Sequence, residues 1–397
     1  MGTLKILFGS LNETNMNTLI NDNNKYNEHS VNKPNKYIVI FILLLSLAGI
    51  IFSFKGQPSI KEVINGKVLS VLAERETILN TGGKDKIVKE QDILVEIKLE
   101  DGNKKEINVL NDYKLVEKGD SIFISESLFE GSEFDVVNVN RTKELILLLI
   151  FFIALVILTS GWKGFYSLVG LIFTFAVIFV YMVPQILRGI NPVIVGIISA
   201  VVILIPTLYL SYGLNKKSIA AFLGIMFALF FVGIASSYFI STLQFTGFSS
   251  ELSVYLDMEA SSAINLIGLI IAGIIIAAVG VLDDVAVIQS SVVFSLARTN
   301  PTLRGFKLFK EAMHIGKDHI SAVVNTLVLA YTGASLPLII LLYIRKMPID
   351  YFVSLEMITE EVARTLISSS GILLAVPLTT IIATTMVNKK LLKEREE

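Results

Sequence analysis

The sequence predicts an all-α membrane bundle with a small β-barrel-like domain inserted near its N-terminus. Of the 397 residues 53% are hydrophobic and 17% are charged, whereas soluble domains are about 25% charged. Apolar runs long enough to cross a bilayer recur through residues 144–388. Residues 55–143 instead have mixed charge and alternate apolar with polar positions, as β-strands do. Together these observations predict about eight transmembrane helices: one anchor, and seven more after the β domain.

The composition excludes several classes of function. The net charge of −1 provides no basic excess for binding nucleic acid. The chain has no cysteine, so disulfides, thiolate metal sites and cysteine nucleophiles are excluded. Phosphate-binding glycine loops, Ser-His-Asp sets and paired hydrolase carboxylates are not recognisable in the sequence, so we expect neither an enzyme nor a cofactor.

The N-terminal part of the chain divides into a tail and an anchor. Residues 1–36 are polar and rich in asparagine, which is typical of a disordered tail. Residues 37–54 are uncharged, and about 18 such residues suffice for one helix across the hydrocarbon. A second tail, residues 389–397, is charged and closes the chain.

Residues 55–143 are predicted to form the β domain. Apolar residues alternate through Ile93, Val95, Ile97 and Leu99, and the turn at Asp101–Asn103 indicates a hairpin. Further short strands are expected at residues 66–72, 121–125 and 134–139. About five strands favour a small barrel or sandwich, and on strand count an OB-like barrel is one candidate.

Seven apolar segments between residues 144 and 388 are predicted to cross the membrane. They are Leu145–Thr159, Phe165–Pro184, Pro192–Leu210, Ser218–Ile240, Ser262–Leu282, Ile320–Ile344 and Leu366–Val387. A tight turn at Gly161–Gly164 separates the first two.

The charged residues of the loops predict the orientation of the chain. Lysine and arginine gather in alternate loops and in the last tail: Lys163, Lys216, Lys217, Arg298, Arg304, Lys307, Lys310, Lys317, Lys389, Lys390, Lys393 and Arg395. The positive-inside rule places these on the cytoplasmic side, so that both termini are inside and the β domain is extracytoplasmic. We therefore expect a multi-pass protein of the cell membrane.

An acidic pair, Asp283 and Asp284, directly follows an apolar run. One interpretation is that the carboxylates lie at the inner membrane surface and are solvated there. The other is that the helix breaks at Gly280 and residues 285–297 form a half-helix, which would place the acids at depth, as in many transporters. Ser291 then shares a helical face with Asp284, and Gln289 lies close by in sequence.

A second polar stretch runs from residue 314 to residue 335. Its spacing predicts one helical stripe of polar side chains: His314, Asp318, Ser321, Asn325 and Thr332, extended by Ser335. The stripe is either hydrogen-bonding glue between helices or a polar track facing the acidic pair. A metal site is not expected, because the adjacent residues Asp318 and His319 point in different directions on a helix. At the start of the last span, Glu361 is a candidate for a third side of the same polar interior.

The candidate pathway or polar-core residues are therefore Asp283, Asp284, Gln289, Ser291, His314, Lys317, Asp318, His319, Asn325, Thr326, Ser335, Glu361 and Arg364.

Three motifs carry a resemblance to a known family. They are Gly-Val-Leu-Asp-Asp-Val at residues 280–285 with Gln289 and Ser291, Gly-Lys-Asp-His-Ile at 316–320 with the following segments 324–331 and 333–337, and Arg-Thr-Leu at 364–366 with Ala-Val-Pro-Leu-Thr-Thr at 375–380. In this the chain resembles the YibE/F-like family of bacterial multi-spanning membrane proteins, over roughly residues 60–386. The chain departs from the family pattern at Lys317, where an arginine is expected, and at Ser295, where a glutamate is common. The resemblance implies fold and membrane location, and it assigns no activity or functional residues.

Two functions are consistent with these patterns. The first is a permease-like transporter or transporter component whose pathway passes the polar residues. The second is a non-transporting scaffold or envelope assembly factor that acts through its β domain. The lipid bilayer is the expected environment, and a protein partner or self-association would suit either function.

Overall fold

The computed structural model describes residues 34–55, 63–81, 84–98, 103–126, 134–259 and 264–396. The chain forms two compact units: Phe54–Phe165, and Met1–Ser53 together with Tyr166–Glu397. The first unit contains the β domain, and the second contains the helical bundle. Most of the predicted first tail, residues 1–33, and residue 397 of the last tail lie outside the described residues.

The β domain is a closed five-stranded barrel. Its strands are β1 (Ile64–Thr81), β2 (Lys84–Lys98), β3 (Lys104–Asn111), β4 (Ser121–Glu126) and β5 (Phe134–Val139). They close in the order β1-β2-β3-β5-β4, with β3 and β5 parallel and the other pairs antiparallel. The predicted alternation is confirmed, because Ile93, Val95 and Ile97 are all at most 1% exposed in the barrel core.

Strands β1 and β2 continue beyond the barrel as a two-stranded arm. Strand β2 pairs with β3 only between Gln91 and Lys98, whereas β1 and β2 pair with each other as far as Thr81 and Lys84. Strand β1 is therefore much longer than the predicted segment 66–72. The predicted turn at Asp101–Asn103 lies mostly outside the described residues, which resume at Asn103.

The helices account for the rest of the described chain. They are α2 (Lys36–Lys55), α3 (Thr142–Ala176), the π-helix η1 (Val177–Met182), α4 (Val183–Leu187), α5 (Pro192–Tyr212), α6 (Lys216–Thr242), α7 (Glu251–Glu259), α8 (Leu266–Thr299), α9 (Gly305–Ala334), α10 (Leu336–Arg345), α11 (Ile349–Ser354) and α12 (Glu356–Glu396). Asparagine side chains cap the starts of three long helices: Asn191 before α5, Asn215 before α6 and Asn265 before α8. Each accepts hydrogen bonds from amides that the helix leaves unpaired.

Within the described residues, six helices are long and apolar enough to cross a membrane, or seven if the bent pair α9–α10 is one span. The sequence predicted eight. The difference lies in the run from α3 to α4, where two predicted spans meet. Gly161 there has a non-helical backbone conformation (φ 57°, ψ −137°), so α3 consists of two helices that join at the glycine. A left-handed φ of this kind is one that glycine adopts readily.

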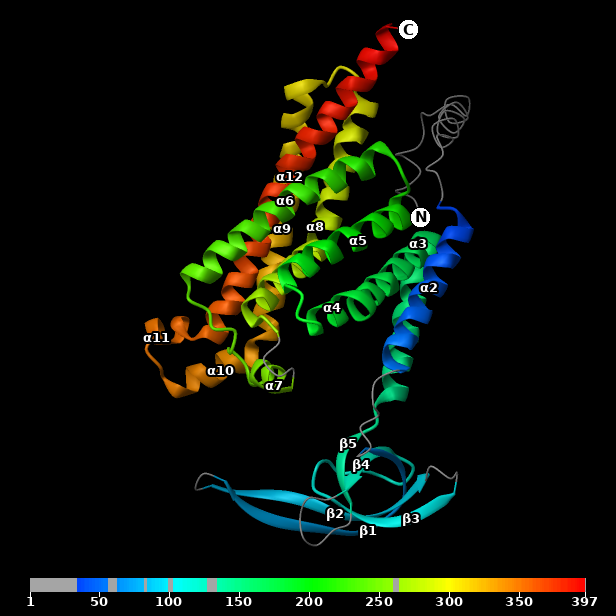
Figure 1. Cartoon of the computed structure of the whole chain (residues 1–397), viewed down its shortest axis with the longest axis vertical. Helices are drawn as coiled ribbons and strands as arrows, with labels where there is room; N and C mark the ends of the chain where they lie inside the picture. The colour runs from blue at the N-terminus through cyan, green and yellow to red at the C-terminus, as the bar shows by residue number, and fades with distance from the viewer. Residues whose placement is uncertain are drawn as a thin grey trace, which may run out of the picture. The chain divides into compact units, whose positions relative to one another are not determined.

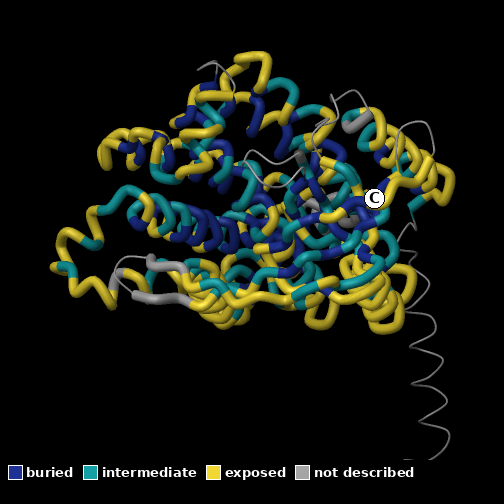
Figure 2. The backbone as a smooth tube through the Cα atoms, turned by 90° about the horizontal axis from the view of Figure 1, so that it is seen from below, coloured by how far each residue is buried: buried dark blue, intermediate teal, exposed yellow. Residues whose placement is uncertain are grey.

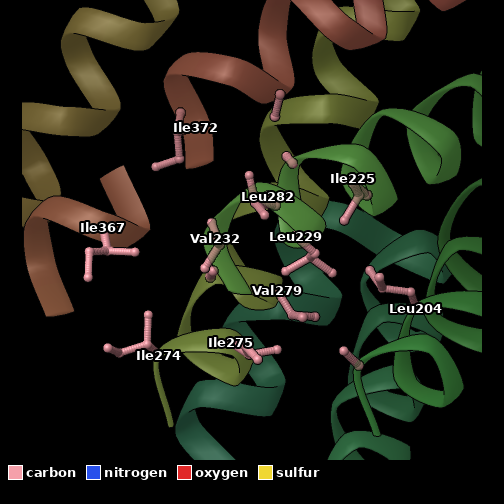
Figure 3. Close-up of a cluster of buried hydrophobic side chains, with 14 of the residues drawn as sticks. Leu204, Ile225, Leu229, Val232, Ile274, Ile275, Val279, Leu282, Ile367 and Ile372 are labelled. Carbon is pink, nitrogen blue, oxygen red and sulfur yellow. The ribbon is translucent and has the colours of Figure 1, made fainter. Parts of the chain in front are cut away.

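The core of the bundle lies among α5, α6, α8 and α12 (Figures 1 and 3). Leu204, Ile225 and Leu282, one from each of the first three helices, are completely buried. Figure 2 shows buried segments inside the bundle and exposed segments around it. The exposed side chains include large apolar ones such as Phe230, which is 71% exposed. Such a surface suits lipid, because the hydrocarbon is as apolar as these side chains.

Small residues allow the helices to approach closely. A β-carbon on Gly224 of α6 would lie 2.0 Å from Thr379 Oγ1 of α12, and one on Gly316 of α9 would lie 2.7 Å from Val376 of α12. Only glycine fits at these crossings. Helices α8, α9 and α12 run side by side as a result (Figure 1), and the polar groups on their facing sides are held at fixed levels.

Candidate functional site

Helix α8 carries the acidic pair in its interior. The helix is continuous from Leu266 to Thr299, so the interpretation in which it breaks at Gly280 is wrong and residues 285–297 are not a separate half-helix. Gly280 is exposed and has no atom within 4 Å of a β-carbon placed on it, so it makes no contact that would force a break. Asp283 and Asp284 therefore lie midway along one long helix.

Two hydrogen-bonded residues mark the level at which α6 begins. The Ser290 hydroxyl donates to the carbonyl of Lys217 (2.9 Å), at the first turn of α6. Gln289, 1% exposed, donates to the hydroxyl of Thr380 (2.7 Å) and to the carbonyl of Ala312 (3.0 Å). Seven residues of helix separate Asp283 from Ser290, which corresponds to about 10 Å. The acidic pair therefore lies about that far inside the bundle, measured from the start of α6.

The acid cluster consists of Asp283, Asp284 and His319 of α9. Oδ1 of Asp283 and Nδ1 of His319 are both buried, and neither has a hydrogen-bond partner among the described residues. Asp284 is exposed and interacts electrostatically with His319, and Asp283 and Asp284 both interact with Tyr212 at the end of α5. The cluster thus combines buried proton acceptors with an accessible carboxylate, an arrangement that can hold a proton or a small cation.

Buried hydroxyls continue the polar interior along α12. Ser368, Ser369 and Thr379 have buried oxygens without a hydrogen-bond partner in the described chain, as does Ser236 of α6. A β-carbon on Gly371, two residues after Ser369, would lie 3.8 Å from Leu282, the neighbour of Asp283. Buried polar atoms normally have a partner, so these hydroxyls are candidates for contacts with water or a transported species.

A second ionic group, the arginine cluster of Arg364, Glu360 and Glu361, lies near the start of α12. Nη2 of Arg364 donates to Glu360 (2.6 Å), and its Nε lies 3.4 Å from Glu361. The other oxygen of Glu360 accepts from the hydroxyl of Ser249 (2.5 Å). On α8 the guanidinium lies against Gly273, ten residues or about 15 Å from Asp283. This cluster is therefore well paired.

The polar stripe of α9 does not face the acidic pair. His314, Asp318, Ser321, Asn325 and Thr332 do share one face, as predicted, but all five are exposed. The opposite face, with Gly316, Ile320, Val323 and Leu327, packs against the bundle. The interpretation of the stripe as a track facing the acidic pair is therefore wrong, because the small and apolar residues of the other face allow closer packing with α8 and α12. His319, to one side of the stripe, is the residue that reaches the acids.

The remaining candidate residues are distributed over several surroundings. Ser291 is half-buried, whereas Lys317 and Thr326 are exposed. Ser335 and Glu361 line a cavity of about 410 Å³ between α9, α10, α11 and α12, together with Tyr331 and Thr365. Sequence reasoning did not identify Tyr212 as a site residue, because Tyr212 meets the acids only through the packing of α5 near α8. It also missed Glu360, although the spacing of four residues between Glu360 and Arg364 on one helix was a signal for their ion pair.

Within the described residues no group of three or more His, Asp or Glu side chains is placed to hold a metal ion. The acid cluster brings two carboxylates of α8 and one imidazole of α9 to one level of the bundle.

Comparison with known protein families places the chain beside one that the three sequence motifs also resemble. A family model described as YibE/F-like protein matches residues 148–389, which is more than half of the chain and includes both clusters. No curated protein and no solved structure matches the chain.

Proposed function

We propose that this chain, which belongs to the YibE/F-like family, is a permease-like transporter or a component of one. One observation carries the proposal: Oδ1 of Asp283 is buried, midway along an apolar helix of the bundle, and has no hydrogen-bond partner among the residues that the structure describes. A carboxylate in such a place is costly, and residues of this kind usually bind an ion or a proton. A purely structural acid would be expected to have a partner, as Glu360 does.

The positions of the polar residues assign each of them a step in the proposed transport. Asp284, which is exposed, would receive the ion or proton, and Asp283 with His319 would hold it. The unpaired hydroxyls of Ser368 and Ser369 would provide the next oxygens along α12. Chain motion would be needed to connect these groups, because Leu282 is completely buried beside them. We therefore propose alternating access, with a proton or a small cation as the coupling species.

The proposed setting is the bacterial cell membrane, with both termini inside and the β domain outside. The asymmetric distribution of lysine and arginine supports this orientation, since basic residues gather where α5 meets α6 and where α8 meets α9: Lys216 and Lys217 at the start of α6, and Arg298, Arg304, Lys307 and Lys310 around the α8–α9 connection. The strand order β1-β2-β3-β5-β4 supports an OB-like barrel, because it is a five-stranded barrel closed with a Greek-key crossover.

The proposal is tested by ion flux in liposomes that contain only the purified full chain. A pH-sensitive dye inside the liposomes reports proton movement when a gradient of H⁺, Na⁺ or K⁺ is imposed. We expect flux from the wild type, and loss of at least about 90% of it from Asp283→Asn, which keeps the size but removes the charge. Glu251→Gln, in the exposed helix α7, is the matched control and should retain the flux.

Equal flux from wild type and Asp283→Asn would contradict the proposal. So would the absence of flux for all three gradients together with unchanged growth of cells that carry Asp283→Asn. The amount of folded protein in each sample is checked by its elution as a single species in detergent.

A scaffold function is the second candidate, and the β1–β2 arm favours it. Ile78 and Ile87 pair across the arm and are 65% and 61% exposed. Apolar side chains exposed on a two-stranded ribbon are typical of a surface that contacts another protein. Replacing both by serine should abolish capture of a partner while flux is unchanged. If flux is lost and capture retained, the arm serves the bundle instead.

A further inference from the structure

The polar face of α9, consisting of His314, Asp318, Ser321, Asn325 and Thr332, is exposed in the chain. The other face of the helix packs against α8 and α12 through residues such as Ile320 and Val323. Thr332 also lines the cavity between α9 and α12. The rest of this polar face takes no part in the packing of the described bundle, and lipid is an unsuitable neighbour for a carboxamide such as that of Asn325.

The position of Asn325 makes this argument stronger. Gly316 contacts Gln289 of α8 and Val376 of α12, at the level where Ser290 reaches the first turn of α6. Asn325 lies nine residues farther along α9, about 14 Å deeper by helical rise. The hydrocarbon is about 30 Å thick, so the carboxamide lies near its middle. An amide exposed to hydrocarbon there has no hydrogen-bond partner and costs several kcal/mol in general terms.

We propose that a second copy of this chain covers the polar face of α9, around a two-fold axis along the membrane normal. Two copies in one membrane have the same orientation, so such an axis brings each Asn325 close to its counterpart. A carboxamide both donates and accepts, which allows the two side chains to bond each other. Lys317 and Asp318 are adjacent and exposed, so each copy brings one cation and one anion to the same level.

The chemistry of the chain favours a second copy over another of its own segments. The residues of α3 from Leu145 to Leu158 are apolar without exception and offer no hydrogen bond to an amide. Helix α2 carries two serines in its apolar stretch, Ser46 and Ser53, and their hydroxyls already donate to the carbonyls of Ile42 and Phe179. The polar face of α9 is matched by an identical face, with Ala322 beside Asn325 leaving room for close approach.

Cysteine cross-linking tests this directly, because the natural chain has no cysteine. Single variants Ala322→Cys and Leu329→Cys, both exposed, are placed in liposomes that contain only this protein and are then oxidised. We expect a disulfide-linked species of twice the 43.7 kDa chain mass. Val323→Cys and Leu327→Cys, on the packed face, should remain monomeric. Phe227→Cys, exposed on α6, controls for random collision and should cross-link far less.

Substitution of Asn325 tests whether its amide stabilises the dimer, or whether the two α9 helices are only close to each other. Asn325→Leu in the Ala322→Cys background should lower the association constant of the dimer about tenfold. Asn325→Gln should leave most of the association in place, because it keeps the amide. The proposal is overturned if cross-linking is the same at positions 322, 323 and 227, or if Asn325→Leu leaves it unchanged. Cross-linking in native membranes to a different protein, without the species of doubled mass, would also overturn it. These readouts do not depend on transport.

Discussion

Two ionic clusters lie about ten residues apart along α8, and they differ in how their charges are paired. In the arginine cluster, Arg364 pairs with Glu360, which also accepts from Ser249. In the acid cluster, Asp283 has a buried oxygen without a partner among the described residues. Both occur in the same bundle, so burial alone does not explain the difference. Paired charges stabilise a fold, whereas unpaired ones are retained when they bind something.

The largest effect is expected from breaking the paired cluster. Arg364→Ala would leave the half-buried Glu360 without its counter-ion, and we expect a loss of up to about 3 kcal/mol of unfolding free energy, the lower end of the range for a fully buried pair. The measurement is the unfolding midpoint of the purified chain in detergent. Arg364→Lys keeps the charge and should recover part of the stability. Equal midpoints for wild type and Arg364→Ala would show that the arginine cluster is not structural.

A smaller loss is expected from Gln289, which is paired although it lies close to the acid cluster. Gln289→Leu keeps the volume but removes the hydrogen bonds to Thr380 and Ala312, so the Ala312 carbonyl loses a donor. The Thr380 hydroxyl keeps its bond to the Val376 carbonyl, so the loss is that of neutral hydrogen bonds, about 0.5–1.5 kcal/mol each. The same unfolding assay should show this loss. If Gln289→Leu unfolds like the wild type, then hydrogen-bonded groups on α8 contribute no more to stability than groups without a partner, and the comparison fails.

Asp283→Asn should change the ion flux and leave the stability of the chain nearly unchanged. Because Oδ1 of Asp283 has no bond to lose, we expect a change in unfolding free energy below about 1 kcal/mol, while ion flux is lost. Stability and flux are measured on the same preparation. A destabilisation as large as that of Arg364→Ala would mean that Asp283 has a structural role.

The smallest effect is expected at Ser369, whose buried hydroxyl has no partner in the described chain. Ser369→Ala removes a polar atom without breaking a bond, so stability should stay the same or rise by a few tenths of a kcal/mol, about the size of a neutral change. If Ser369 lines the pathway, flux should fall moderately. A loss above about 2 kcal/mol would indicate a hydrogen bond to buried water.

Much of the fold was predictable, because hydrophobic runs and alternation report on local surroundings. The predicted span Pro192–Leu210 agrees with α5 to within two residues, and Ser218–Ile240 agrees equally well with α6. Strand β5 has the predicted bounds. The arm of β1 and β2 was not predicted, since its charged residues lack the apolar alternation of the barrel strands.

The candidate site was only partly predictable. Periodicity shows that Asp318 and Asn325 share a face, but it does not show which neighbour that face meets. The face of α9 that packs against the bundle is the one with Gly316 and Val323, because these small or apolar residues pack more closely with α12 and α8. The helix break at Gly280 was wrong for a related reason. A glycine and an acidic pair weaken a helix locally, whereas the packing of α8 against α5, α6 and α12 keeps it continuous.

The central claim is that Asp283 lies on a pathway, and solvent access to that position tests it most directly. Asp283→Cys in sealed vesicles of known orientation is exposed to a membrane-impermeant maleimide from one side and then from the other. The pathway predicts labelling from both sides, because alternating access opens the acid cluster to each in turn. Labelling only from the side of the basic loops would contradict the claim and would leave Asp283 and Asp284 as ordinary interfacial carboxylates.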